Sequence, residues 1–210
     1  VSEIDLDFLL AENDPDQASN ALELEAFRQL PNTQLAIDSI RWRESNIGGL
    51  SLSAGWEQSD LYLSSVTGVL AGFNLNDETA LRWSLGEDGD EQTQLNFVAS
   101  LNDPEQFFPL FSAEPVMRLS RGDVDTDLSW PGSPMEFDLQ SVSGLASLQF
   151  ADGSFLPVSS DATGALRFIS LFNLAGLVQR SNVNQLFDSG LTFDRASGDI
   201  AFDQGVLSVN

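Results

Sequence analysis

The chain has 210 residues, 42% of them hydrophobic, and its 32 acidic and 9 basic side chains give a formal net charge of -23. Such a negative field repels phosphate backbones, so we expect no nucleic-acid partner. The sequence contains no His, Cys or Lys, which excludes Ser-His and Cys-His nucleophiles, lysine Schiff bases and zinc sites built on His or Cys.

Apolar and polar residues alternate along most of the chain, a pattern typical of half-buried β-strands. The alternation predicts strands over 3–11, 35–42, 49–56, 80–85, 93–101, 124–130, 135–142, 144–151, 154–158, 191–195, 198–203 and 205–209. A phase slip between Ile37 and Ile40 indicates a β-bulge. Strands that recur about every 8 to 12 residues favour a long, twisted, largely antiparallel meander.

Three turns separate strands in this pattern. Residues 86–92 form a polar loop with two glycines, which predicts a hairpin between 80–85 and 93–101. The Asp-Gly pair within 151–154 predicts a second hairpin, and Gly205 predicts a third. Because both ends of the sequence read as strands, we expect a single domain, 1–210, that is a segment of a longer chain.

Helical patterns are few. Residues 20–30 fit either a short helix or a strand, and 102–111 fit about one helical turn, with Asp103 as its N-cap. The best helix runs over 165–180 and is apolar nearly all round, so it is buried or meets something other than water. It is shorter than the roughly 20 residues that a bilayer span requires. Its apolar residues include Leu166, Phe168, Ile169, Leu171, Phe172 and Leu177.

The acidic clusters provide the only candidates for chemistry. Asp123, Asp125 and Asp127 have the spacing that opens an EF-hand loop, but the glycine and the distal glutamate of that loop are out of place. A solvated strand face explains them better. Carboxylate pairs could hydrolyse a glycoside, yet nothing among 32 acids selects one pair. We therefore expect a protein that is not an enzyme and holds no metal or cofactor.

Residues 128–205 carry a family resemblance. The run Trp130-Pro131-Gly132-Ser133-Pro134 is followed by Gly144, the pair Asp152-Gly153, the apolar segment LFNLAGL and the segment GLTFDRASGDIAFDQG. This order resembles the C-terminal region of the YhdP branch of the AsmA-like superfamily, and a weaker similarity extends back to about residue 30. The segment 178–190 departs from the family, because Arg180 stands alone where relatives have an Arg-Arg-Leu run.

The resemblance implies a protein anchored in the inner membrane of Gram-negative bacteria by an N-terminal helix that is absent from this chain. It implies a taco-like β-groove across the periplasm that conducts phospholipid toward the outer membrane without catalytic residues. The expected partners are phospholipid acyl chains, the remainder of the same chain, and an outer-membrane or other envelope protein.

Combined with the alternation, this implies an apolar groove whose lining residues can be named. The candidates are Leu52, Trp83, Leu95, Phe97, Phe107, Phe111, Trp130, Phe137 and Leu139. The helix over 165–180 would lie against the sheet, plug the end of the groove or contact the outer membrane. Two other hypotheses stay open at this point: a structural or docking end-cap without lipid conduction, and a carboxylate glycosidase of the cell wall.

Overall fold

The computed structural model describes residues 3–5, 24, 31–42, 45–86, 89–101, 106, 117–155 and 191–209. These residues form eleven strands and one short 3₁₀-helix, η3. The strands are β1 (Glu3–Asp5), β2 (Thr33–Trp42), β3 (Ser45–Glu57), β4 (Asp60–Leu70), β5 (Phe73–Leu75), β6 (Ala80–Leu85), β7 (Glu91–Leu101), β8 (Met117–Pro131), β9 (Ser143–Phe155), β10 (Leu191–Asp203) and β11 (Val206–Val209), and η3 spans Pro134–Glu136.

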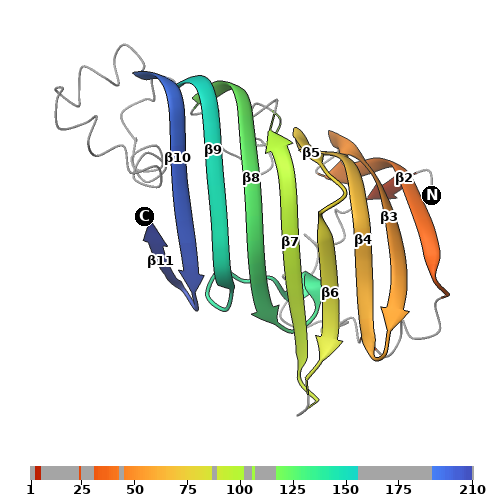
Figure 1. Ribbon diagram of the computed structural model, residues 1–210. Helices are drawn as coiled ribbons and strands as arrows, with labels where there is room; N and C mark the ends of the chain where they lie inside the picture. The colour runs from red at the N-terminus through yellow and green to blue at the C-terminus, as the bar shows by residue number, and fades with distance from the viewer. Residues whose placement is uncertain are drawn as a thin grey trace, which may run out of the picture.

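All eleven strands belong to one mixed sheet that runs from β1 to β11 nearly in chain order (Figure 1). The short strands β5 and β6 lie one above the other between β4 and β7. Every pair is antiparallel except β1 with β2, which is parallel. The predicted meander is therefore confirmed from β2 onward, and the parallel β1 is a departure from it.

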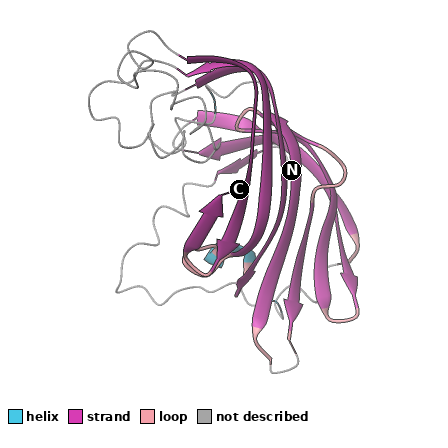
Figure 2. Ribbon diagram, turned by 60° about the vertical axis from the view of Figure 1, so that its left-hand side comes forward, coloured by secondary structure: helices cyan, strands magenta, loops and turns pink. Residues whose placement is uncertain are grey.

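The sheet is curved rather than flat, as the side view in Figure 2 shows. Glycine allows close approach of neighbouring strands at sharp bends in a sheet. Gly144 on β9 has a φ of 134°, and a Cβ atom there would lie 2.0 Å from the carbonyl oxygen of Asp127 on β8. Gly48 and Gly68, on β3 and β4, have the same φ and similarly close neighbours.

Two of the predicted hairpins are confirmed. β6 and β7 pair on either side of the loop at 86–90, where the Gly86 amide donates to the Asp90 carbonyl at 2.8 Å. β10 and β11 meet at Gln204 and Gly205, whose positive φ values of 44° and 90° match a two-residue hairpin turn. The bulge in β2 is also confirmed, as a register shift between Ile37 and Ile40 against β3.

The hairpin predicted at 151–154 is wrong, because β9 runs straight through it. Asp152 has the positive φ of a turn residue, 48°, yet β9 stays paired on both sides of it. Leu119 of β8 and Phe193 of β10 both pair with Gly153. Ladder hydrogen bonds to two neighbouring strands outweigh the local turn preference of the Asp-Gly pair. The strands predicted at 144–151 and 154–158 are thus one strand as far as Phe155, and 191–195 and 198–203 likewise merge into β10.

The strand predicted over 135–142 is also wrong. Pro134 opens η3, and the Ser133 amide donates to the Glu136 carboxylate at 2.7 Å. Asp138 then closes a turn, because its carboxylate accepts from the Gln140 amide at 3.0 Å and its carbonyl accepts from the Val142 amide at 3.0 Å. These local hydrogen bonds compete successfully with the alternating pattern.

Strand β4 was not expected from the sequence. Its alternation is interrupted at Ser65, which has a φ of 51°, and the register against β3 shifts between Ser51 and Ser53. Only Leu24 is described within 20–30 and only Gln106 within 102–111, and both are helical. The helix predicted over 165–180 lies outside the described residues, and no long helix occurs among the residues that the structure describes.

The substitution Gly144→Ala tests the close approach of β8 and β9. We expect it to lower the free energy of unfolding by about 3 kcal/mol or more, because the added Cβ combines a strained φ with a backbone collision. Gly89→Ala is the matched control, since Gly89 also has a positive φ, 84°, but no atom within 4 Å of the added Cβ. It should cost only about 1 kcal/mol. Equal urea midpoints for the two variants would contradict the close approach.

Candidate functional site

One face of the sheet is apolar along rows that cross the strands. In a sheet, residues that pair across strands stand side by side on the same face. The first row, which we call the leucine row, crosses from β3 to β11. It consists of Ala54, Leu63, Leu81, Leu95, Leu128, Gly144, Phe202 and Leu207.

Two further rows extend the same face toward the other end of the strands. The second consists of Ile37, Leu50, Gly68, Leu75, Ala99, Val124, Leu148 and Gly198. The third consists of Ile40, Gly48, Leu70, Phe73, Leu101, Gly122, Phe150 and Ala196. No charged side chain interrupts these rows, so the sheet carries one continuous apolar face from β2 to β10.

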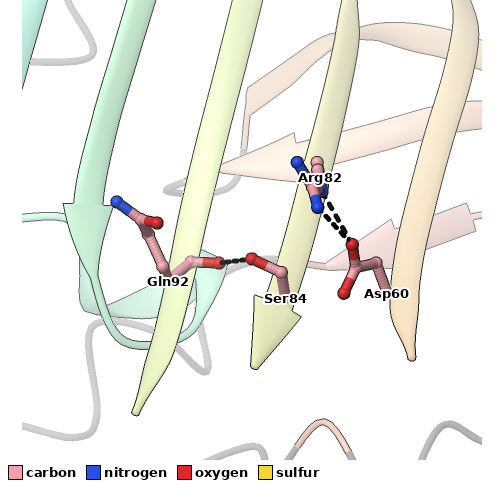
Figure 3. A network of polar contacts seen from close by, with 4 residues as sticks. All are labelled: Asp60, Arg82, Ser84 and Gln92. Carbon is pink, nitrogen blue, oxygen red and sulfur yellow. Dashed lines mark hydrogen bonds and ion pairs between the residues drawn. The ribbon is translucent and has the colours of Figure 1, made fainter. Parts of the chain in front are cut away.

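The opposite face is polar. One of its rows consists of Tyr62, Arg82, Gln94, Ser129, Ser143 and Asp203. Figure 3 shows the polar contacts at the start of this row, where Arg82 Nε donates to the Asp60 carboxylate at 2.8 Å and Ser84 donates to the Gln92 carbonyl at 3.4 Å. The hydrogen bond to Asp60 raises the pKa of Arg82 above its ordinary value, which favours the charged guanidinium. The two faces therefore differ sharply in polarity.

Burial varies along the apolar face. Leu24 is fully buried against Leu61 and Trp83, and a second cluster forms around Val66, Leu75 and Ala99. Other members of the rows, including Leu95, Leu128 and Leu148, stay partly exposed. Within the described part of the chain, no second sheet covers this face.

The nine residues predicted to line the groove fall into three groups by their place in the structure. Five lie on the apolar face: Leu52, Trp83, Leu95, Phe97 and Trp130. Phe137 and Leu139 lie in the turn after η3 and are 47% and 55% exposed, so they do not belong to the strand rows. Phe137 still meets the apolar face at one point, because its ring packs edge-on against Trp130 with the centroids 5.2 Å apart.

The remaining predicted residues lie outside the described residues. These are Phe107 and Phe111, together with Leu166, Phe168, Ile169, Leu171, Phe172 and Leu177 of the predicted helix. Their roles in lining, plugging or docking stay predictions.

Glu91 is a polar residue of the apolar face, although the sequence predicted it as part of the polar hairpin loop 86–92. Its carboxylate accepts from the Trp83 indole at 2.9 Å and from the Leu24 amide at 3.2 Å. Glu91 thus holds Leu24 against the sheet. The sequence pattern could have placed Glu91 on the apolar face, because Glu91, Thr93 and Leu95 are every second residue of one strand and therefore share a face.

The acidic run on β8 does not form a metal site. Asp123, Asp125 and Asp127 alternate onto the polar face, where Arg121 Nε donates to Asp123 at 3.0 Å. The described residues contain no group of three or more acidic side chains that could hold a metal ion. A solvated strand face, the simpler reading of this run, fits the structure.

The fold and the polarity of its two faces define the class of protein: a large, curved β-sheet with one apolar and one polar face. The family model described as YhdP protein matches residues 3–210, and the chain belongs to the YhdP family. This membership confirms the resemblance to the YhdP branch of the AsmA-like superfamily, identifies a cell-envelope protein and points to lipid transport as the general function. No curated protein and no solved structure matches the chain.

Among the described residues, no helix has the length and hydrophobicity needed to cross a bilayer.

Replacing Glu91 tests its role on the apolar face. Glu91→Ala leaves the Trp83 indole and the Leu24 amide without their acceptor, so we expect the free energy of unfolding to fall by about 1–3 kcal/mol. The neighbouring exposed residue provides the control, since Gln92→Ala should change it by less than about 0.5 kcal/mol. Urea titration of both variants measures the difference, and an unchanged stability of Glu91→Ala would rule out the role.

Proposed function

We propose that this sheet is a segment of a hydrophobic groove that carries phospholipid acyl chains across the periplasm, between the inner and outer membranes. The protein would act without catalysis and without a cofactor. Its anchor in the inner membrane would belong to a part of the protein outside this chain.

The observation that carries this proposal is the continuity of the apolar rows. Each row runs across the strands, so an acyl chain moving along a row passes from one apolar residue to the next, from β2 to β10. Neighbouring strands lie about 4.8 Å apart, so there is no wide polar gap between successive contacts. A surface built to bind one ligand in one place would instead bring a few polar groups together.

Solvent exclusion provides the driving force for binding. Each methylene that leaves water gains about 0.8 kcal/mol, and this gain does not depend on a specific orientation. A uniform apolar wall therefore binds a chain firmly overall while keeping the barriers to sliding low. The headgroup would stay in water at the open side of the curved sheet.

The polar face fits the same function. Asp123, Asp125 and Asp127 lie on this face and give it negative charge. Such charge keeps the outside of a groove soluble and repels anionic membrane surfaces, so lipid would be taken up by the apolar face alone.

Photo-crosslinking tests which face of the sheet binds lipid. A photoreactive amino acid at Leu95 on the apolar face, in the full-length protein in cells, should become labelled with phospholipid. The same photoreactive amino acid in place of Gln94, the neighbouring residue on the polar face, should give only background labelling. Labelled products are measured by mass spectrometry after purification.

Two outcomes would count against lipid conduction. Equal labelling at Leu95 and Gln94 would remove the distinction between the faces. Absence of lipid at Leu95, with loss of envelope function when the apolar face is altered, would favour the structural or docking end-cap.

A charge placed on the apolar face tests sliding along the second row. Leu148→Asp places a carboxylate among aliphatic side chains, where an acyl chain would have to desolvate it, so lipid transfer by the full-length protein should fall severalfold. Gln149→Asp adds the same charge on the polar face, next in sequence, and should leave transfer unchanged. Circular dichroism of both variants separates a blocked groove from an unfolded sheet. Equal transfer by two folded variants would contradict the proposal.

A further inference from the structure

Three of the four tryptophans lie in a single row across the sheet. Trp56 pairs with Leu61, Leu61 with Trp83, Trp83 with Thr93, and Thr93 with Trp130. We call these five residues the tryptophan row. Its tryptophans stand on β3, β6 and β8, two strands apart each time, which spaces them by about 10 Å.

The tryptophan row borders the leucine row at one set of strand ends. Each of its members lies two residues from a member of the leucine row on the same strand, as Trp83 does from Leu81. Beyond the row, β3 turns into β4, β6 into β7, and β8 into η3, all at the lower edge of the sheet in Figure 1. The row therefore marks the boundary between the apolar face and the polar turns.

The protein itself provides acceptors for two of the three indole N–H groups. Trp83 donates to the Glu91 carboxylate at 2.9 Å, and Trp130 donates to the Ser133 carbonyl at 3.0 Å. The indole N–H of Trp56 is shielded from solvent and has no acceptor among the residues that the structure describes. A buried donor without a partner is costly, so Trp56 is poised to bind an acceptor that a ligand brings.

We propose that Trp56 donates a hydrogen bond to an ester carbonyl of the bound phospholipid, and that the tryptophan row sets the depth at which lipid lies in the groove. This inference rests on the proposed function and deepens it. The glycerol esters are the first polar groups after the acyl chains. With the acyl chains on the leucine row, one row away at about 7 Å, the ester oxygens fall at the tryptophan row.

The properties of indole suit this boundary. A tryptophan presents a large apolar ring to the acyl chain and one N–H donor to the polar end, as tryptophans do at membrane interfaces. Trp56 packs against the cluster of Leu24, Leu61 and Trp83. A lipid carbonyl reaches its N–H when side chains of this cluster, Leu24 among them, shift aside.

The test compares two lipids with the full chain. One is a diester phosphatidylcholine, and the other is the diether analogue with identical alkyl chains and headgroup but no carbonyls. The wild-type protein should bind the diester about fivefold more tightly, as expected for one hydrogen bond. Trp56→Phe keeps an aromatic ring and removes the N–H, so it should bind both lipids equally. Affinities are measured by native mass spectrometry or by displacement of a fluorescent lipid.

Tyr62→Phe is the matched control. It also removes one donor from an aromatic side chain, but Tyr62 stands in the row of the polar face with Arg82, so this variant should keep the wild-type preference for the diester. Equal binding of the two lipids by the wild type, or an unchanged preference in a folded Trp56→Phe variant, would overturn the role of Trp56 and leave the groove intact. Failure of the wild type to bind either lipid would instead overturn the proposed function.

Discussion

The whole structure depends on one constraint, which is that side chains alternate between the two faces of a strand and neighbouring strands keep this alternation in register. A slip of one residue would turn an apolar row to the polar face. Bulges keep the phase where the sequence breaks it. One lies between Ile37 and Ile40 on β2, and another lies at Ser65 on β4. The apolar face is therefore a property of the ladder as a whole, and no single strand provides it.

This constraint also suits the proposed function, which would need no catalytic site. The rows run across the strands, so each added strand lengthens the apolar rows. Each position in a row needs only an apolar residue. At one boundary of the face, Glu91, Trp56 and η3 introduce polar groups. A lipid has the same organisation, with long uniform chains that end in a few polar groups.

Alternation in the sequence was enough to predict most of the strands and to place Leu52, Trp83, Leu95, Phe97 and Trp130 on one face. It failed where local and long-range hydrogen bonds compete. At 151–154 the pairing of β9 with two neighbours overrode a turn signal, and at 135–142 side-chain hydrogen bonds to the backbone overrode a strand signal. Strand β4 escaped prediction because the bulge at Ser65 interrupts its pattern.

The sequence by itself determined that this is a β-sheet with one apolar and one polar face, because alternation is a local property that each strand carries independently. Only the tertiary structure decided which residues stand side by side. Trp56, Trp83 and Trp130 are far apart in the sequence, and register brings them into one row. The contact of Glu91 with Leu24 has the same origin. Register is set by backbone hydrogen bonds between strands and by the glycines and bulges that bend them, and these depend on the assembled sheet.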